Sequence, residues 1–104
     1  MTKATFYFDE NVPYSFLITG HSGFAEEGED IVCASISSAA YMVANTITEV
    51  LKVNAKIEVS DGRMKLTVNK EQRHITKDIL LGLKIHFDGL HEQYPDFVET
   101  LMEV

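Results

Sequence analysis

An alternating segment interrupted by a single Asp-Gly pair constrains the fold of this chain more than any other feature. Apolar and polar residues alternate over residues 53–60 and again over residues 63–69, with Asp61-Gly62 between them. Strict alternation is typical of a strand with one buried face, and Asp-Gly is a favoured two-residue hairpin turn. The pattern therefore predicts a β-hairpin with one apolar and one solvated face. Its expected pairs are Val59 with Met64, Ile57 with Leu66, Ala55 with Val68 and, on the solvated face, Glu58 with Lys65.

Three further segments have the composition of strands. Residues 3–9 are aromatic and β-prone, and a turn is expected from Asp9 to Pro13. Residues 14–19 follow as a second strand, whose apolar run predicts burial on both faces. Residues 97–104 alternate weakly, which allows a short edge strand at the end of the chain.

Two segments have helical spacing of apolar residues. The first is expected to begin at Ile31, with Asp30 as its N-cap, and to run to about Leu51. The second is expected from about Lys70 to His91, and Pro95 ends it. The order β-β-α-β-β-α, with the optional final strand, predicts an α+β two-layer sandwich in a single domain over residues 1–104. The apolar stripe expected on the second helix is Ile75, Ile79, Leu83, Phe87 and Leu90.

Charge and cysteine content limit the classes of partner. The net charge of −7 argues against nucleic acid and against an anionic membrane surface, and it favours a basic partner. One cysteine allows no internal disulfide, and the first residues lack the apolar core of a signal peptide. No stretch is expected to supply the ~20 apolar residues of a membrane span. These observations predict a cytoplasmic protein.

Cys33 and His21 are the candidate catalytic pair. Cys33 is expected in the first turn of a helix, where unpaired N–H groups and the helix dipole stabilise a thiolate. The backbone N–H groups of Cys33 and Ala34 are then oxyanion-hole candidates. His21 lies in a glycine-rich loop and is the candidate base, which would take the thiol proton and return it to a leaving amine.

Plainer explanations exist for each of these residues. A lone helical cysteine is commonly a small buried hydrophobe, and Asp is favoured at an N-cap whatever the function. Ser37 would by default be a small packing residue. The other histidines, which are His74, His86 and His91, form no i, i+4 pair and accompany no cysteine cluster, so no metal site is expected.

Two blocks of sequence resemble the ribosomal-processing cysteine proteases of the Prp, or YsxB-like, family. The blocks are Gly20-His21-Ser22-Gly23-Phe24-Ala25 and Asp30-Ile31-Val32-Cys33-Ala34, the second followed one turn later by Ser37. The resemblance extends over nearly the whole chain. One mild departure is Ser22, where many relatives carry alanine.

The resemblance implies a cysteine endopeptidase without a cofactor, in which Cys33 is the nucleophile and His21 the general base. It implies supporting roles for Asp30 and Ser37, and it makes the loop residues Gly20, Ser22, Gly23 and Phe24 candidates for substrate binding. The substrate it implies is the N-terminal extension of a bacterial large-subunit ribosomal protein precursor, which is basic. It also implies a homodimer.

Two rival interpretations remain open at this level. One is a non-enzymatic, ribosome-associated module that binds a basic ribosomal protein through an acidic surface. The other is a structural dimer in which the Cys33 thiol is buried and inert.

Overall fold

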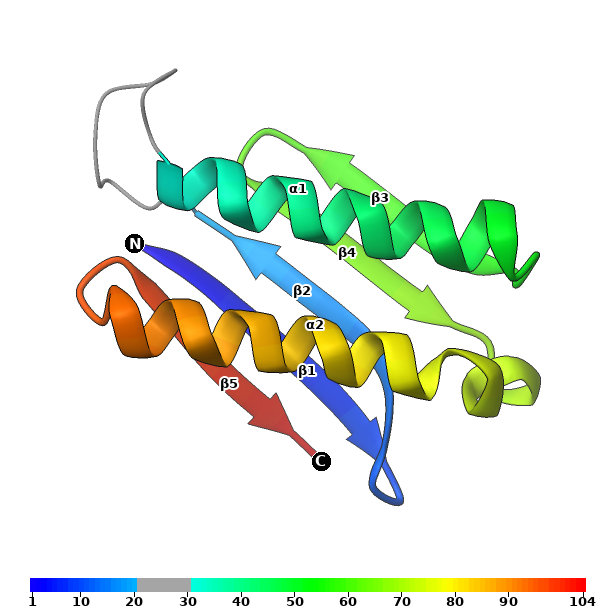
Figure 1. The fold of residues 1–104 in the computed structure, drawn as a ribbon. Helices are drawn as coiled ribbons and strands as arrows, with labels where there is room; N and C mark the ends of the chain where they lie inside the picture. Colours follow the sequence, from blue (N-terminus) through cyan, green and yellow to red (C-terminus); the bar gives the residue numbers. More distant parts are fainter. Residues whose placement is uncertain (21–30) are drawn as a thin grey trace.

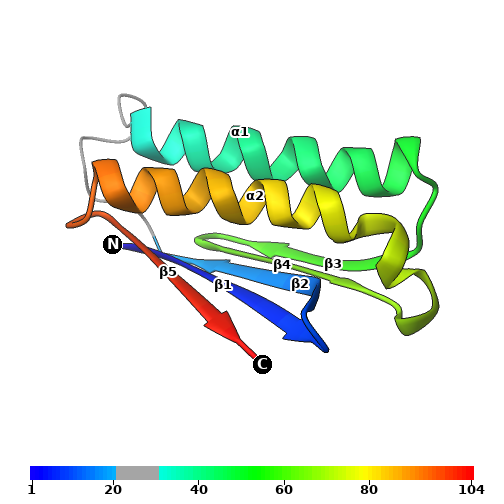
Figure 2. The same ribbon diagram turned by 60° about the horizontal axis from the view of Figure 1, so that its bottom comes forward.

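The computed structural model describes residues 1–20 and 31–104, which fold into two layers. A five-stranded sheet forms one layer (Figure 1). Helices α1 (Ile31–Asn45) and α2 (Arg73–Gln93) lie side by side across one face of that sheet (Figure 2). The α+β two-layer sandwich predicted from the sequence is confirmed.

The sheet has the strand order β3-β4-β2-β1-β5. Strand β5 is parallel to β1, and the other neighbouring pairs are antiparallel. The chain therefore begins near one edge of the sheet, and β3 and β5 are the two edge strands. The strand bounds are β1 Thr2–Asp9, β2 Val12–Thr19, β3 Ala55–Ser60, β4 Arg63–Val68 and β5 Val98–Glu103.

The β3–β4 hairpin has the predicted turn and register, and all four predicted pairs are present. Gly62 has a φ of 68°, which suits its place in the two-residue turn. The predicted burial of the apolar face holds for β4 and is wrong for β3. Ile57 and Val59 are 38% and 54% exposed, because an edge strand has a neighbour on one side only.

The β1–β2 turn is tighter than predicted. It consists of Glu10 and Asn11, both with positive φ, as a two-residue turn between twisted strands requires. Strand β2 therefore begins at Val12, and the expectation of a turn reaching Pro13 is wrong. The sheet tolerates this proline because β4 pairs with β2 only from Ser15 onward.

The two faces of strand β2 are buried to different degrees. Phe16 and Ile18 are buried in the core, whereas Leu17 and Thr19 are half-buried on the opposite face, which no described helix covers (Figure 2). On that face only Ser15 is buried among residues 14–19, with its hydroxyl donating a 2.8 Å hydrogen bond to the backbone oxygen of Leu66. The predicted burial on both faces therefore holds only in part. An antiparallel strand of this kind needs only one covered face.

The core lies between the sheet and the two helices. The Phe6 ring is 6.3 Å from that of Phe16 and 5.8 Å from that of Phe87, which joins β1, β2 and α2. On α2 the buried stripe begins at Thr76 rather than at the predicted Ile75, which is 43% exposed. Residues four apart in a helix differ by about 40° in direction around its axis. The predicted stripe uses successive four-residue steps, so its first residues turn away from the core. The buried residues of α2 are Thr76, Leu80, Leu83, Phe87 and Leu90.

The first helical segment has the predicted extent, ending at Val50 rather than Leu51, but the expectation that no stretch is apolar enough to span a membrane is wrong. Helix α1 continues into a π-helical turn, and together, over Ile31–Val50, they have the length and apolar composition of a membrane-spanning helix. Core helices of soluble proteins meet the same criterion. Here the residues Val32, Ile36, Val43 and Ile47 of the segment are buried in the core that it shares with the sheet.

Candidate active site

Cys33 is the third residue of α1, so its predicted place in the first turn of a helix is confirmed. Its side chain is half-buried rather than enclosed in the core. The backbone N–H groups of a first helical turn have no acceptor within the helix. The thiol thus lies where the helix dipole can stabilise a thiolate. The backbone N–H groups of Cys33 and Ala34, the two oxyanion-hole candidates, lie in the same turn.

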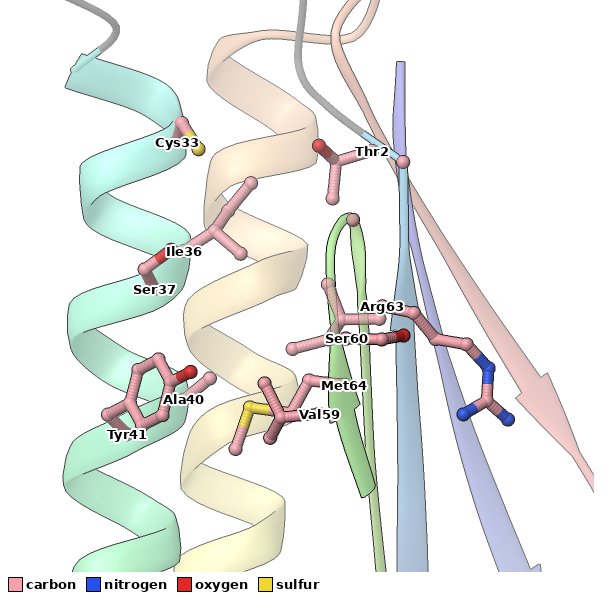
Figure 3. A pocket seen from close by; sticks show the side chains of 13 residues that line it. Thr2, Cys33, Ile36, Ser37, Ala40, Tyr41, Val59, Ser60, Arg63 and Met64 are labelled. Carbon is pink, nitrogen blue, oxygen red and sulfur yellow. The ribbon is translucent and has the colours of Figure 1, made fainter. Parts of the chain in front are cut away.

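A cavity of about 140 Å³ opens beside this thiol, between the first turns of α1 and the β3–β4 turn. Figure 3 shows the sulfur of Cys33 pointing from α1 toward the sheet, into the same space that Thr2 borders from β1. Four segments distant in sequence therefore meet around one nucleophilic atom. The residues that line the cavity are Thr2, Ile18, Gly20, Cys33, Ile36, Ser37, Ala40, Tyr41, Val59, Ser60, Gly62, Arg63 and Met64.

One face of α1 forms a wall of the cavity. Cys33, Ser37 and Tyr41 follow one another at four-residue steps along this wall (Figure 3). Ile36 and Ala40 lie beneath them and are buried in the core. The structure therefore brings Ser37, a predicted supporting residue, to the same cavity as Cys33, and Ser37 is exposed there rather than packed.

Gly20 directly follows β2 and lines the cavity in a conformation that favours glycine. Its φ is +87°, and a Cβ built on it would lie 2.4 Å from the backbone oxygen of Met1. Its N–H donates a 2.8 Å hydrogen bond to the carbonyl oxygen of Gly62 in the β3–β4 turn. Of the loop residues singled out in the sequence, Gly20 thus has a defined place: it holds three backbone segments together beside Cys33.

The remaining predicted site residues lie outside the described residues. They are His21, Ser22, Gly23, Phe24 and Asp30.

The other three histidines lie away from the cavity. His86 is on α2, and its Nε2 is 3.3 Å from the backbone oxygen of Ser35 on α1. The Nδ1 of His91 is 2.6 Å from the backbone oxygen of Val98, and His74 is exposed. Within residues 1–20 and 31–104, no three His, Cys, Asp or Glu side chains gather as a metal ion would require.

Sequence reasoning missed most of the sheet side of the cavity. Thr2, Val59 and Met64 carry no chemical motif, and only the packing of the assembled sheet against α1 brings them to Cys33. Tyr41 could have been predicted to lie at the cavity, because it continues the four-residue spacing from Cys33 through Ser37. Arg63 lies at the cavity, but Figure 3 shows its guanidinium pointing away from Cys33.

Comparison with known proteins places the chain among the cysteine proteases. The chain belongs to the family described as cysteine protease Prp, whose model matches residues 1–99. A relative in Bacillus subtilis, the ribosomal processing cysteine protease Prp, is 24% identical over 88 residues, which cover 79% of each chain.

Two solved structures of an essential ribosomal processing protease Prp from S. aureus share the fold. One, with a covalently linked product peptide, has a TM-score of 0.91 and 21% identity, covering 99% of this chain and 100% of that one. The other, with a substrate peptide, has a TM-score of 0.85 and 18% identity over the same shares. The family resemblance inferred from the sequence is confirmed.

Proposed function

We propose that this protein is a cysteine endopeptidase that removes the N-terminal extension of a bacterial large-subunit ribosomal protein precursor. The observation that carries the proposal is the placement of Cys33 in the first turn of α1, with its thiol opening into a cavity between the helix and the sheet. Family membership and a relative described as a ribosomal processing cysteine protease support the substrate class. Residues 1–104 serve as one catalytic domain.

The reaction proceeds through an acyl-enzyme. The sulfur of Cys33 attacks the carbonyl carbon of the scissile peptide while His21 takes the thiol proton, and the oxyanion is held by the N–H groups of Cys33 and Ala34. The C–N bond breaks, and His21 gives its proton to the leaving amine. Water then attacks the thioester, with His21 taking a proton from it. The C–S bond breaks and the thiol is restored.

The chain's own geometry supports these assignments. His21 directly follows Gly20, whose backbone lines the Cys33 cavity, so the base is covalently tethered next to the site. Ser37 lies one turn from Cys33 on the same wall, where its hydroxyl can contact a bound peptide. Asp30 would support the start of α1, and Ser22, Gly23 and Phe24 would contact substrate from the same loop.

A cleavage assay with matched variants tests this function. A synthetic peptide spanning the extension and the mature N-terminus is incubated with wild type, Cys33→Ala, His21→Ala and Gln93→Ala, and products are identified by mass spectrometry. We expect Cys33→Ala and His21→Ala to lose at least about 1,000-fold in kcat/KM. Gln93→Ala changes an exposed residue at the end of α2 outside the cavity and should cleave like wild type.

Binding measured in parallel separates the rival interpretations. Retained binding of the peptide by Cys33→Ala without cleavage supports the protease. Binding by wild type without cleavage would instead indicate an acidic module that captures a basic ribosomal protein. Cleavage by Cys33→Ala at the wild-type rate would overturn the nucleophile assignment.

We also infer that the protein acts in the cytoplasm as a homodimer. Its proposed substrate is made and assembled there. The small residues Ala34 and Ser38 leave the first half of α1 slender and exposed, which suits close approach by a second subunit. Light scattering coupled to size-exclusion chromatography tests this: a mass near twice 11.7 kDa is expected, and a single-chain mass at micromolar concentration would contradict it.

A further inference from the structure

The edge strand β3 has exposed apolar side chains on the same face of the sheet as the core. Val59 is 54% exposed and Ile57 38% exposed, while their partners on β4, Met64 and Leu66, are buried. Among the described residues β3 pairs only with β4, so the peptide groups along its other side are unpaired within the sheet. A surface with these two properties is suited to an extended peptide, which satisfies the backbone and covers the side chains together.

This edge is continuous with the Cys33 cavity. Val59 and Ser60, at the end of β3, line the cavity from the sheet, and Tyr41 lines it from α1. Figure 3 shows the side chains of Tyr41 and Val59 further along α1 than the Cys33 sulfur, and all three residues line the same cavity. Tyr41 and Val59 are both large, exposed and apolar, at 47% and 54%. We call this pair the Tyr41–Val59 surface.

The spacing along α1 fixes how far the Tyr41–Val59 surface lies from the reacting sulfur. Tyr41 is eight positions after Cys33, and a helix rises about 1.5 Å per residue, so the two lie about 12 Å apart along the axis. An extended peptide advances about 3.3 Å per residue. A side chain on this surface therefore belongs to a substrate residue about three to four positions from the scissile bond.

We propose that the substrate peptide leaves the Cys33 cavity as an added strand along the free edge of β3, with an apolar side chain about three to four residues from the scissile bond held on the Tyr41–Val59 surface. The proposal rests on the proposed protease function and deepens it by naming a specificity-determining surface. Its occupant is an extended, apolar segment of the precursor. The backbone of β3 fixes the register, and Tyr41 and Val59 select the side chain.

A cycle of enzyme and substrate variants tests the surface. Peptides with single apolar-to-Ala changes at each position within five residues of the cleavage point are compared on wild type, Tyr41→Ala and Val59→Ala. On wild type, one change three or four residues from the bond should lower kcat/KM about tenfold. With the Tyr41→Ala and Val59→Ala enzymes, the same peptide change should lower kcat/KM less than about twofold. The enzyme side chain that contacts the changed peptide residue is already missing from these variants.

Met42→Ala provides the matched control, because Met42 adjoins Tyr41 on α1 and is 58% exposed but does not line the cavity. Met42→Ala should show the same tenfold difference in kcat/KM between the unchanged and the changed peptide as wild type. Equal selectivity in Tyr41→Ala, Val59→Ala and wild type would overturn the proposal, even if Cys33→Ala abolishes cleavage. Loss of the Cys33 requirement itself would instead refute the proposed function.

Backbone-modified peptides test the added strand. N-methylation removes one N–H and blocks pairing on one side of a strand, so methylation at alternate positions of the bound segment should lower kcat/KM at least about tenfold. No effect at any position would overturn the strand addition. Conversion of a dimer to single chains by Val59→Asp would also overturn it, because the edge of β3 would then be the contact between two copies.

Discussion

At the scale of single residues, Gly20 shows how closely the site depends on backbone geometry. The residue has a positive φ, donates a hydrogen bond to Gly62 and lies against the backbone oxygen of Met1. Any other residue would place its Cβ 2.4 Å from that oxygen, and a backbone atom cannot rotate away as a side chain can. The geometry beside Cys33 is therefore fixed by the absence of a side chain at one position.

Replacing Gly20 by alanine should destabilise the protein and distort the cavity. We expect Gly20→Ala to lower the free energy of unfolding by about 1–3 kcal/mol, because it adds strain at positive φ and a clash with Met1. The control is Gly82→Ala on α2, where an added Cβ meets nothing within 4 Å. That change should raise stability by about 0.5–1 kcal/mol. Urea unfolding followed by circular dichroism measures both, and equal effects would contradict this explanation.

The sequence could predict part of the site and not the rest, for identifiable reasons. Cys33 and Ser37 could be placed together because a helix puts residues four apart on one face. Thr2 and Val59 could not be placed beside Cys33 from the sequence, since their positions depend on pairing between strands that are distant in the chain. Gly20 could be marked as a loop glycine, but the backbone approach that makes it necessary exists only in the folded protein.

At the scale of elements, local sequence patterns predicted the structure reliably where two independent signals agreed. The β3–β4 hairpin has its predicted register because turn and alternation specify the same pairs. The stripe on α2 was displaced at its start, since positions four apart drift around the helix, and burial passes to Thr76 and Leu80. Exposure of Ile57 on β3 was not predictable, because alternation does not reveal which strand is an edge.

Adjacent leucines on α2 allow a direct test of this packing. Leu80 is fully buried, whereas Leu81, the next residue, is 36% exposed. Leu80→Ala should cost about 2–5 kcal/mol of unfolding free energy through lost burial and a residual cavity. Leu81→Ala should cost less than about 1 kcal/mol, and both are measured by chemical denaturation. A larger effect at Leu81 would mean that the α2 stripe is wrongly assigned.

At the scale of the whole molecule, charge governs how the enzyme meets its proposed substrate. Sixteen acidic and nine basic residues give the chain a net charge of −7. The proposed substrate, a ribosomal protein precursor, is expected to be basic, so long-range attraction should accelerate its encounter with this protein. This steering acts on the approach of the entire precursor, while cleavage depends on the few residues around Cys33.

Salt should therefore separate approach from chemistry. Raising NaCl from about 50 mM to about 500 mM shortens the screening length and should lower kcat/KM for the full precursor at least about threefold. A short, uncharged peptide carrying the same cleavage point should change by less than about 1.5-fold. Equal salt dependence for both substrates would show that charge plays no part in the encounter.

The parallel pairing of β1 with β5 closes one edge of the sheet late in folding. Thr2 lines the cavity, and its N–H donates a 2.9 Å hydrogen bond to the carbonyl oxygen of Phe97, just before β5. This bond joins residues far apart in sequence, a kind of contact that forms slowly. All residues that line the cavity, in contrast, lie between Thr2 and Met64, and β1 already pairs with β2 within that part of the chain. The cavity beside Cys33 can therefore begin to take shape on a nascent chain before β5 has been made.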